Sequence, residues 1–451
     1  MIKKILIANR GEIAVRVIRA AKEMGIKTVA VYSEADKDSL HVKLADQAVC
    51  IGPAPSNKSY LVYQNLLGAA EATNADAIHP GYGFLSENAD FADACKALNI
   101  EFIGPSSEAI RAMGDKATAR KTMTAAGVPI TPGSKDIINT DDEAIAAAKT
   151  IGYPVIIKAS AGGGGKGMRV AENEDELLDA FHTASSEALA SFKNGDVYME
   201  HYVQNPRHIE VQILGDKHGN VIHLFERDCS IQRRHQKLLE EAPSPALDEA
   251  TRKAMGEAAI KAAKAVGYYS AGTIEFLLDK NGSFYFMEMN TRVQVEHPVT
   301  ETITGIDIIK EQLRIASGKK LSYNQEHVHH HGHAIECRIN AENTEMNFAP
   351  CPGKVTKYIA PGGFGVRIDS AMYQDYTILP FYDSMVAKLI VHGKDRTEAI
   401  ERMKRALSEF VIEGVSTTIP FQQKVLEHKA FIDGEFDTSF IEKYFPNYLK
   451  K

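Results

Sequence analysis

The chain has 451 residues, of which 44% are hydrophobic and 25% are charged, a composition typical of a globular protein with about two to four domains. Lys and Arg number 52 against 59 for Asp and Glu. The resulting formal net charge of −7 argues against nucleic-acid binding, and no stretch approaches the ~18 apolar residues of a membrane span. The apolar start, residues 2–8, is too short for a secretory signal, so we expect a soluble cytoplasmic protein.

The N-terminal part of the chain predicts an open, mostly parallel α/β sheet. A β-branched run at residues 3–8 is followed by a turn, a helical pattern ending near Gly25, and a second strand at 28–32. Further strands are expected at 77–79 and 102–104. The first turn contains a single glycine, Gly11, instead of the G-x-G-x-x-G pattern, so a dinucleotide site is not indicated.

Residues 132–203 predict a compact α/β unit between two linkers, which we interpret as a mobile lid. A strand ending at Lys158 leads into the glycine-rich stretch 162–167. Glycines beside a strand allow backbone N–H groups to close on phosphate oxygens. The alternative is a flexible surface turn, because the stretch lacks the G-x-x-x-x-G-K-[ST] pattern.

A β-hairpin is predicted at residues 272–290, around Asn281-Gly282. With a two-residue turn, Lys280 would pair with Ser283 and Glu275 would lie opposite Glu288. Opposed like charges destabilise a strand pair, and Asn290 shares their face by the period of two. Two carboxylates and an amide oxygen are ligands that Mg²⁺ prefers, so we predict a metal site. The alternative is a single carboxylate that is solvated or paired with a lysine.

Two more polar patterns follow. Arg292, Gln294 and Glu296 alternate, and on an extended chain they would share the face of Glu288 and Asn290. Taken alone, Glu296 is interpreted as an ion-pair partner rather than a base, but beside the metal-ligand candidates, Arg292 and Gln294 the base is favoured. At 333–340 a strand is expected with Glu336, Arg338 and Asn340 on its polar face, which a solvated outer face would explain equally well. Strands at 354–359 and 384–392 follow, then a helix from residue 395.

These residues resemble the ATP-grasp ligases, and specifically the biotin carboxylase family. The resemblance rests on Lys158 with the glycine-rich stretch, on Glu275 and on the segment 288–298. It extends to the motifs at 7–14, 79–88, 113–116 and 381–385 and covers residues 1–446. It implies a multidomain α/β and α+β fold with an N-terminal α/β domain (1–113), an ATP-grasp domain (114–330, lid 132–203) and a C-terminal domain (331–451).

The resemblance implies an ATP-binding set of phosphate-binding lysines and lid glycines, a hinge strand for adenine, pocket residues and two metal-binding acids. The set is Lys116, Lys158, Gly164, Gly165, Glu200, His201, Tyr202, Val203, His208, Gln232, His235, Glu275 and Glu288. Glu275, Glu288 and Asn290 would coordinate Mg²⁺ or Mn²⁺, with two ions expected.

The other implied ligands are bicarbonate and biotin. Bicarbonate would be held by Lys237, Arg292, Gln294, Val295 and Glu296, with Glu296 as its base. Biotin would contact Tyr82 and Arg338. The groups implied as catalytic are Arg292, Glu296, Lys237 and Arg338.

The implied reaction is ATP-dependent carboxylation of biotin through carboxyphosphate, the first half-reaction of acetyl-CoA carboxylase or of a two-subunit pyruvate carboxylase. No Ala-Met-Lys-Met attachment site occurs, so biotin would be carried by a separate protein that also serves a carboxyltransferase. A homodimer is implied, with Arg19 and Glu23 where the family places its dimer contact, although an ordinary helix-surface pair explains them equally. Lys166 stands where many relatives have Arg.

Two other functions stay open at this point. One keeps the ATP-grasp machinery but passes the activated carboxyl group to an amine, as in carbamoyl-phosphate or purine-pathway enzymes. The other is a non-catalytic ATP-binding regulator, against which the complete set Glu275, Glu288, Arg292 and Glu296 argues.

Overall fold

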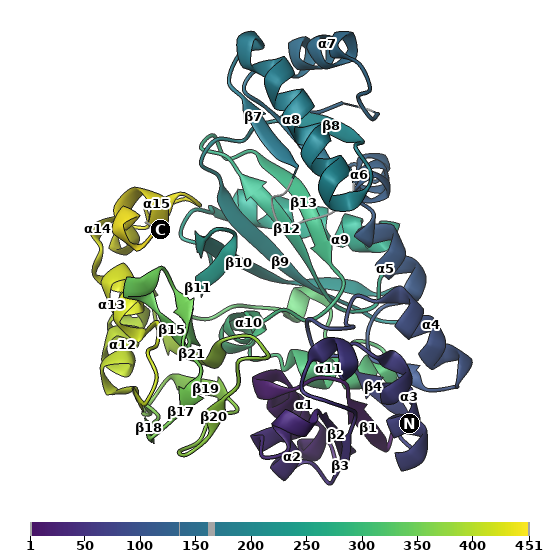
Figure 1. The fold of residues 1–451 in the computed structure, drawn as a ribbon, viewed down its shortest axis with the longest axis vertical. Coiled ribbons are helices and arrows are strands. Elements are labelled where there is room, and N and C mark those ends of the chain that lie inside the picture. Colours follow the sequence, from purple (N-terminus) through teal and green to yellow (C-terminus); the bar gives the residue numbers. More distant parts are fainter. Residues whose placement is uncertain (1, 135, 161–166, 450–451) are drawn as a thin grey trace.

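Five parallel strands form the N-terminal sheet, in the order β3-β2-β1-β4-β5 (Figure 1). The computed structural model describes residues 2–134, 136–160 and 167–449. The strands are β1 (Lys4–Ile7), β2 (Lys27–Tyr32), β3 (Gln47–Cys50), β4 (Ala77–His79) and β5 (Glu101–Phe102), and the helices are α1 (Gly11–Glu23), α2 (Leu40–Leu44), α3 (Tyr63–Thr73) and α4 (Ala89–Ala97). All strand pairs are parallel, as the sequence predicts.

Residues 132–203 form a separate small unit, at the top of Figure 1. Its antiparallel sheet has the order β7-β6-β8, and the helices α7 and α8 pack on it around a core of its own. Thr140 and Glu143 form a capping box at the start of α7. The elements are α7 (Asp141–Ile151), β6 (Val155–Ala159), β7 (Met168–Ala171), α8 (Glu174–Phe192) and β8 (Val197–His201). Residues 162–166 of the glycine-rich stretch lie outside the described residues.

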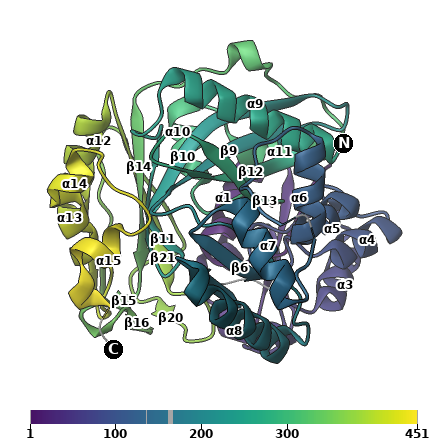
Figure 2. The ribbon, with the colours of Figure 1, turned by 90° about the horizontal axis from the view of Figure 1, so that it is seen from above.

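An eight-stranded antiparallel sheet forms the centre of the molecule, in the order β13-β12-β9-β10-β11-β14-β21-β19. Figure 2 shows it from above, with α9 (Glu249–Ala265) at the top and the C-terminal helices at the left. The strands are β9 (Arg207–Gly215), β10 (Val221–Arg233), β11 (Gln236–Ala242), β12 (Ser270–Leu278), β13 (Phe284–Asn290), β14 (His333–Asn340), β19 (Val366–Ser370) and β21 (Met385–Gly393). Because β11 pairs with β14, the sheet is continuous across the expected limit at residue 330.

The remaining elements surround this sheet. The helices are α5 (Ser107–Gly114), α6 (Lys116–Ala125), α9 (Glu249–Ala265), α10 (His297–Thr304), α11 (Ile308–Ala316), α12 (Arg396–Glu409), α13 (Ile419–Glu427), α14 (Lys429–Ile432) and α15 (Phe440–Tyr444). The short strands are β15 (Glu342–Asn343), β16 (Ala349–Pro350), β17 (Gly353–Lys354), β18 (Lys357–Ile359), β20 (Thr377–Ile378) and β22 (Val411–Glu413).

The prediction of a single strand at 354–359 is wrong. The chain changes partners at Val355 and Thr356, so β17 pairs with β20 and β18 with β22. The helix expected from residue 395 is confirmed as α12, capped by the Asp395 side chain. Among the described residues, no helix has the length and apolarity that crossing a membrane requires.

Candidate active site

A cavity of about 1190 Å³ lies where the lid unit, the central sheet and the N- and C-terminal parts of the chain meet. Its lining includes eighteen of the predicted site residues: Tyr82, Lys158, Glu200, His201, Tyr202, Val203, His208, Gln232, His235, Lys237, Glu275, Glu288, Asn290, Arg292, Gln294, Val295, Glu296 and Arg338. Lys116 is exposed at the first turn of α6 and does not line the cavity. Gly164 and Gly165 lie outside the described residues.

The hairpin of β12 and β13 brings Glu275 opposite Glu288, as predicted, but its loop and its strand register differ from the prediction. The two-residue turn is wrong, because Asp279 pairs with Ser283 and a three-residue loop closes with Gly282 at φ +82°. The Asp279 carboxylate accepts hydrogen bonds from the backbone N–H groups of Asn281 and Ser283, which favours this longer loop. A β-bulge at Met287 then restores the opposed pair.

The carboxylate of Glu275 is buried and fully engaged. It accepts hydrogen bonds from Lys237 Nζ at 3.1 Å, Asn290 Nδ2 at 2.8 Å and Gln294 Nε2 at 2.7 Å, and it pairs with His208 at 2.8 Å. Burial acts to raise the pKa of Glu275, but Lys237 and His208 outweigh it and hold that pKa well below its usual value. Glu275 is therefore ionised at neutral pH.

Glu288 has the opposite environment. Burial raises its pKa, and the charge of Glu275 across the strand pair raises it further. The nearby donors His208, Lys237 and Asn290 are directed to Glu275, and among the described residues none of these three hydrogen-bonds Glu288. A carboxylate held beside another one without a partner is a position that a cation stabilises. With the amide oxygen of Asn290 on the same face, the oxygen donor set suits Mg²⁺.

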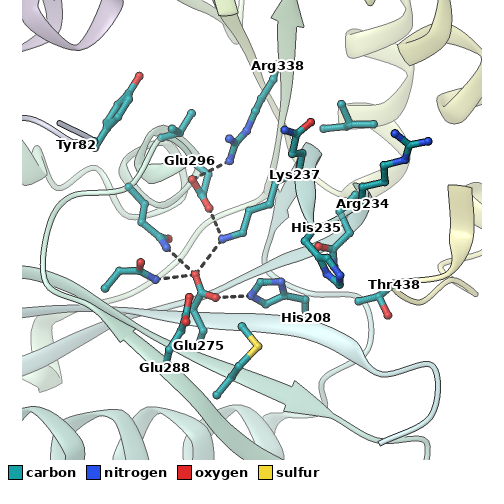
Figure 3. A pocket seen from close by; sticks show the side chains of 18 of the residues that line it. Tyr82, His208, Arg234, His235, Lys237, Glu275, Glu288, Glu296, Arg338 and Thr438 are labelled. Carbon is teal, nitrogen blue, oxygen red and sulfur yellow. Dashed lines mark hydrogen bonds and ion pairs between the residues drawn. The ribbon is translucent and has the colours of Figure 1, made fainter. Parts of the chain in front are cut away.

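Glu296 lies at the centre of a second cluster (Figure 3). Its carboxylate accepts from Lys237 Nζ at 2.6 Å and from Arg338 Nη2 at 3.0 Å. Burial acts to raise the pKa of Glu296, whereas Lys237, Arg338 and the buried Arg227 lower it well below its usual value. The acid is therefore ionised and lies between two cations that come from different strands.

The extended conformation expected for 291–296 is wrong. The chain bends after β13 and turns at Glu296, which occupies the N-cap position of α10. Its side chains still converge on the cavity because the bends, rather than strand alternation, direct them there. The amide of Gln294 is shared between Glu275 and Arg227, and the carbonyl oxygen of Val295 accepts from Lys388 at 2.8 Å.

Two acids that the sequence analysis missed hold the cations in place. Glu87 pairs with Arg292 at 2.9 Å, and the same guanidinium donates to Asn290 Oδ1 at 3.0 Å. Glu210 on β9 is completely buried and accepts from Lys237 at 2.6 Å. A sequence pattern could have indicated Glu210, because His208, Glu210 and Gln212 alternate within an otherwise apolar strand.

The polar face of β14 belongs to the cavity region and is not a solvated outer face. Glu336 is fully buried, and Arg338 donates through Nε to Glu240 at 2.6 Å and through Nη2 to Glu296. The interpretation that a solvated outer face explains the alternation of polar residues in this strand is therefore wrong.

Tyr82 approaches the cavity from the N-terminal part of the chain. The Asn9 amide donates to the carbonyl oxygens of Pro80 and Tyr82, at 2.8 Å each, and so fixes the turn that carries the ring. Gly81 has φ +65°, and a Cβ atom there would lie 2.9 Å from the Asn9 amide nitrogen. Glycine is required at this position for both reasons. The Tyr82 hydroxyl donates to Glu12.

The junction between the lid unit and the rest of the chain is held by Glu200 on β8. Its two carboxylate oxygens accept from Arg120 and Lys158, each at 2.5 Å. Arg120 also donates to the carbonyl oxygen of Thr131, at the start of the lid unit. This triad links the first residues of the lid to its last strand at the mouth of the cavity.

Family models match nearly the whole chain. The model described as the N-terminal domain of biotin carboxylase matches residues 1–110, the ATP-binding domain of the carbamoyl-phosphate synthase L chain matches 115–324, and the C-terminal domain of biotin carboxylase matches 336–443. The chain belongs to the biotin carboxylase family. The resemblance and the multidomain fold class that it implied are thereby confirmed.

Individual relatives show how close the similarity is. The chain is 63% identical to biotin carboxylase 1 of Bacillus subtilis over 98% of this chain and 99% of that protein. A crystal structure of the Campylobacter jejuni biotin carboxylase in complex with an ATP analogue superimposes with a TM-score of 0.94 at 55% identity, covering 98% of this chain and 99% of that one.

A second solved structure is the biotin carboxylase domain dimer of the Hydrogenobacter thermophilus 2-oxoglutarate carboxylase, in complex with MgADP, ADP and bicarbonate. Its TM-score is 0.92 at 52% identity, covering 100% of this chain and 99% of that one. These structures belong to the same family as this chain and have the same fold throughout.

Proposed function

We propose that this chain carboxylates biotin on a separate carrier protein, using bicarbonate and ATP and releasing ADP and phosphate. The observation that carries the proposal is the bridging position of Glu296 between Lys237 and Arg338. One cation would hold bicarbonate and the other biotin, so a single carboxylate would contact both reactants. The relatives named biotin carboxylase support this assignment.

Glu296 would act as the base that removes the proton of bicarbonate. The two cations keep it ionised but also make it weakly basic. When Lys237 turns to bicarbonate and Arg338 to biotin, Glu296 would lose two of the three positive charges that lower its pKa. Its proton affinity would therefore rise only once both reactants are bound.

An oxygen of the deprotonated bicarbonate would attack the γ-phosphorus of ATP, and the bond to the bridging oxygen would break and release ADP. Lys158 and Lys116 would neutralise the phosphate charge, Gly164 and Gly165 would close over the phosphates from the lid, and residues 200–203 would contact adenine. Mg²⁺ or Mn²⁺, two ions held by Glu275, Glu288 and Asn290, would supply charge neutralisation at the phosphates when bound. His208, Gln232 and His235 would line the nucleotide pocket.

The product, carboxyphosphate, would break its C–O bond to give CO₂ and phosphate. Phosphate would take the ureido proton of biotin, and the ureido nitrogen would then form its bond to the carbon of CO₂. Arg338, with Tyr82 beside it, would stabilise the negative charge on the ureido oxygen. Lys237, Arg292, Gln294 and Val295 would hold bicarbonate in place for the first step.

Closure of the lid unit at 132–203 would exclude water from carboxyphosphate, which water would otherwise destroy. The carrier protein and a carboxyltransferase complete the reaction. We propose acetyl-CoA as the final acceptor, with pyruvate as the alternative. A homodimer is supported by the relative described as a dimer. Of the two residues expected at the dimer contact, Glu23 forms an ion pair within the chain, with Lys310 on α11 at 2.6 Å.

The test is ADP release and transfer of labelled bicarbonate carbon to biotin, with Glu296→Gln as the matched control. We expect free biotin to increase bicarbonate-dependent ADP release and to become labelled, and Glu296→Gln to abolish both. Bicarbonate-dependent ADP release that biotin does not raise would instead support transfer to an amine. Absence of any ATP cleavage would support a nucleotide-binding regulator. A pull-down of the biotinylated carrier with its carboxyltransferase decides the acceptor.

A further inference from the structure

Two buried carboxyl groups lie opposite each other beside Arg338, and neither is in the proposed reaction. Glu240 on β11 is paired with Glu336 on β14, and both side chains are fully buried. Glu240 accepts the Nε–H of Arg338 through one oxygen, at 2.6 Å. Its other oxygen and both oxygens of Glu336 have no hydrogen-bond partner within the described part of the chain.

The surroundings of the pair are apolar on the side away from the cavity. Ile390 lies opposite Glu336 on β21, and it belongs to a cluster with Val299 and Ile303 of α10. A buried carboxylate without a hydrogen-bond donor is strongly destabilised relative to one in water. Two such carboxylates facing each other also repel.

The charged and titratable groups around the pair come from all the elements that pack against it. They are Cys229 on β10, Lys237 on β11, Glu296 at the start of α10, Cys337 and Arg338 on β14, and Lys388 on β21. These cations are shared with other acids, because Lys388 also pairs with Glu12 at 3.0 Å and Arg338 also pairs with Glu296. Too little positive charge is left to stabilise two ionised acids.

We propose that Glu336 is protonated and donates a hydrogen bond to the free oxygen of Glu240, so that the pair carries one negative charge and Glu240 positions Arg338. The proposal rests on the function proposed above. A single proton provides partners for the orphaned oxygen of Glu240 and for the hydroxyl of Glu336. It also leaves Glu240 as the carboxylate that orients the guanidinium through Nε.

The charge balance has a consequence for the reaction. If both acids were ionised, Arg338 would be surrounded by Glu240, Glu336 and Glu296, and their negative charge would oppose the charge that develops on biotin. With Glu336 neutral, Arg338 keeps more of its positive potential. Burial is also the leading cause that raises the pKa of Glu336 well above its usual value and that of Glu240 to about 7. Glu240 and Glu336 are therefore positioning residues.

Infrared spectroscopy tests the proton directly and needs no turnover. The difference spectrum of the wild-type protein against Glu336→Gln should contain the C=O stretch of a buried carboxylic acid, shifted by ¹³C-glutamate labelling. The exposed-site variant Glu413→Gln should not change that band. Absence of the band from the wild-type protein at neutral pH would overturn the proposal.

The pH profile of biotin-dependent turnover tests the positioning role. Glu336→Gln, whose amide can make the same hydrogen bond, should keep kcat within about threefold of the wild type, whereas Glu336→Leu should lose about tenfold, the rate equivalent of one hydrogen bond. Both variants should lack the alkaline fall in rate that follows deprotonation of the pair, because neither Gln nor Leu carries a proton to lose at residue 336. Equal losses in both variants with an unchanged alkaline limb would overturn the role. An intact infrared band in a wild-type protein without biotin-dependent turnover would refute only the proposed function.

Discussion

Glu275 and Glu288 lie opposite each other on β12 and β13 because Met287 is an extra residue in the ladder. The three-residue loop shifts the register by one position, and the bulge at Met287 shifts it back. Phe286 and Met289 consequently stay in the apolar core, while Met287, Glu288 and Asn290 line the cavity. This arrangement leaves a carboxylate pair at the cavity wall, and it is the basis of the first prediction.

Glu288→Gln should raise the Mg²⁺ concentration required for nucleotide-dependent ADP release by at least about tenfold, because one of the few oxygen ligands loses its charge. The same change removes repulsion between opposed acids, so the protein without metal should gain about 0.2–1 kcal/mol of stability. Thermal unfolding with and without Mg²⁺ and nucleotide checks both effects. Glu71→Gln, at an exposed position of α3, is the control. An unchanged metal titration would contradict the metal site.

Arg292→Ala should reduce biotin-dependent ATP cleavage by about a hundredfold or more, as loss of a charge that stabilises a transition state does. Nucleotide binding should persist, because the residues proposed to contact adenine and the phosphates lie elsewhere in the cavity. Glu87→Gln should give a smaller loss, since Glu87 only orients the guanidinium. Steady-state kinetics and nucleotide titration separate these effects. Arg111→Ala, which breaks comparable surface ion pairs, is the matched control, and undiminished turnover of Arg292→Ala would remove it from the catalytic set.

Arg120→Gln should weaken nucleotide binding by about tenfold, the effect of losing roughly one charge-assisted hydrogen bond. Without Arg120, Glu200 keeps only Lys158, and the carbonyl of Thr131 loses its donor at the entry to the lid unit. Calorimetric titration with ADP measures the change. The neighbouring exposed lysine provides the control variant Lys121→Gln. Equal affinities for the two variants would show that the triad does not support the nucleotide site.

Glu241 predicts a defined pH dependence of stability. Burial acts to raise its pKa, but Arg396 and His333 outweigh it and lower the pKa from 4.5 to about 2. An acid with a lowered pKa stabilises the folded state above its unfolded pKa, and this contribution is lost as the pH falls from 4.5 towards 2. Glu241→Gln should therefore be less stable by about 3 kcal/mol near neutral pH, as expected when a buried ion pair loses one partner.

The measurement for Glu241 is the free energy of unfolding in urea at a series of pH values. The difference between the wild type and Glu241→Gln should shrink below pH 4.5. A difference that stays constant down to pH 2 would show that Glu241 does not titrate with the lowered pKa. Glu71→Gln again serves as the exposed control, for which no pH-dependent difference is expected.

Local patterns in the sequence were sufficient for several elements of this protein. Apolar runs and turn residues determined the parallel N-terminal sheet, the capping residues determined the starts of α7 and α12, and long motifs determined the family. These features depend on neighbouring residues, whose spacing the chain itself specifies. The opposition of Glu275 and Glu288 was also predicted, but two local departures from the expected hairpin had to cancel.

The tertiary structure alone decided which charges meet. The period of two placed polar residues on one face of β9 and β14, but strand order determined that Lys237 lies among Glu210, Glu275 and Glu296. Arg292 pairs with Glu87, which lies on a loop distant in the sequence. Glu336 lies opposite Glu240 only because β14 continues the central sheet beside β11. Alternation fixes the face of a side chain, whereas its neighbours across the sheet depend on contacts between distant segments, and those neighbours set the charge and proton affinity of every group in the cavity.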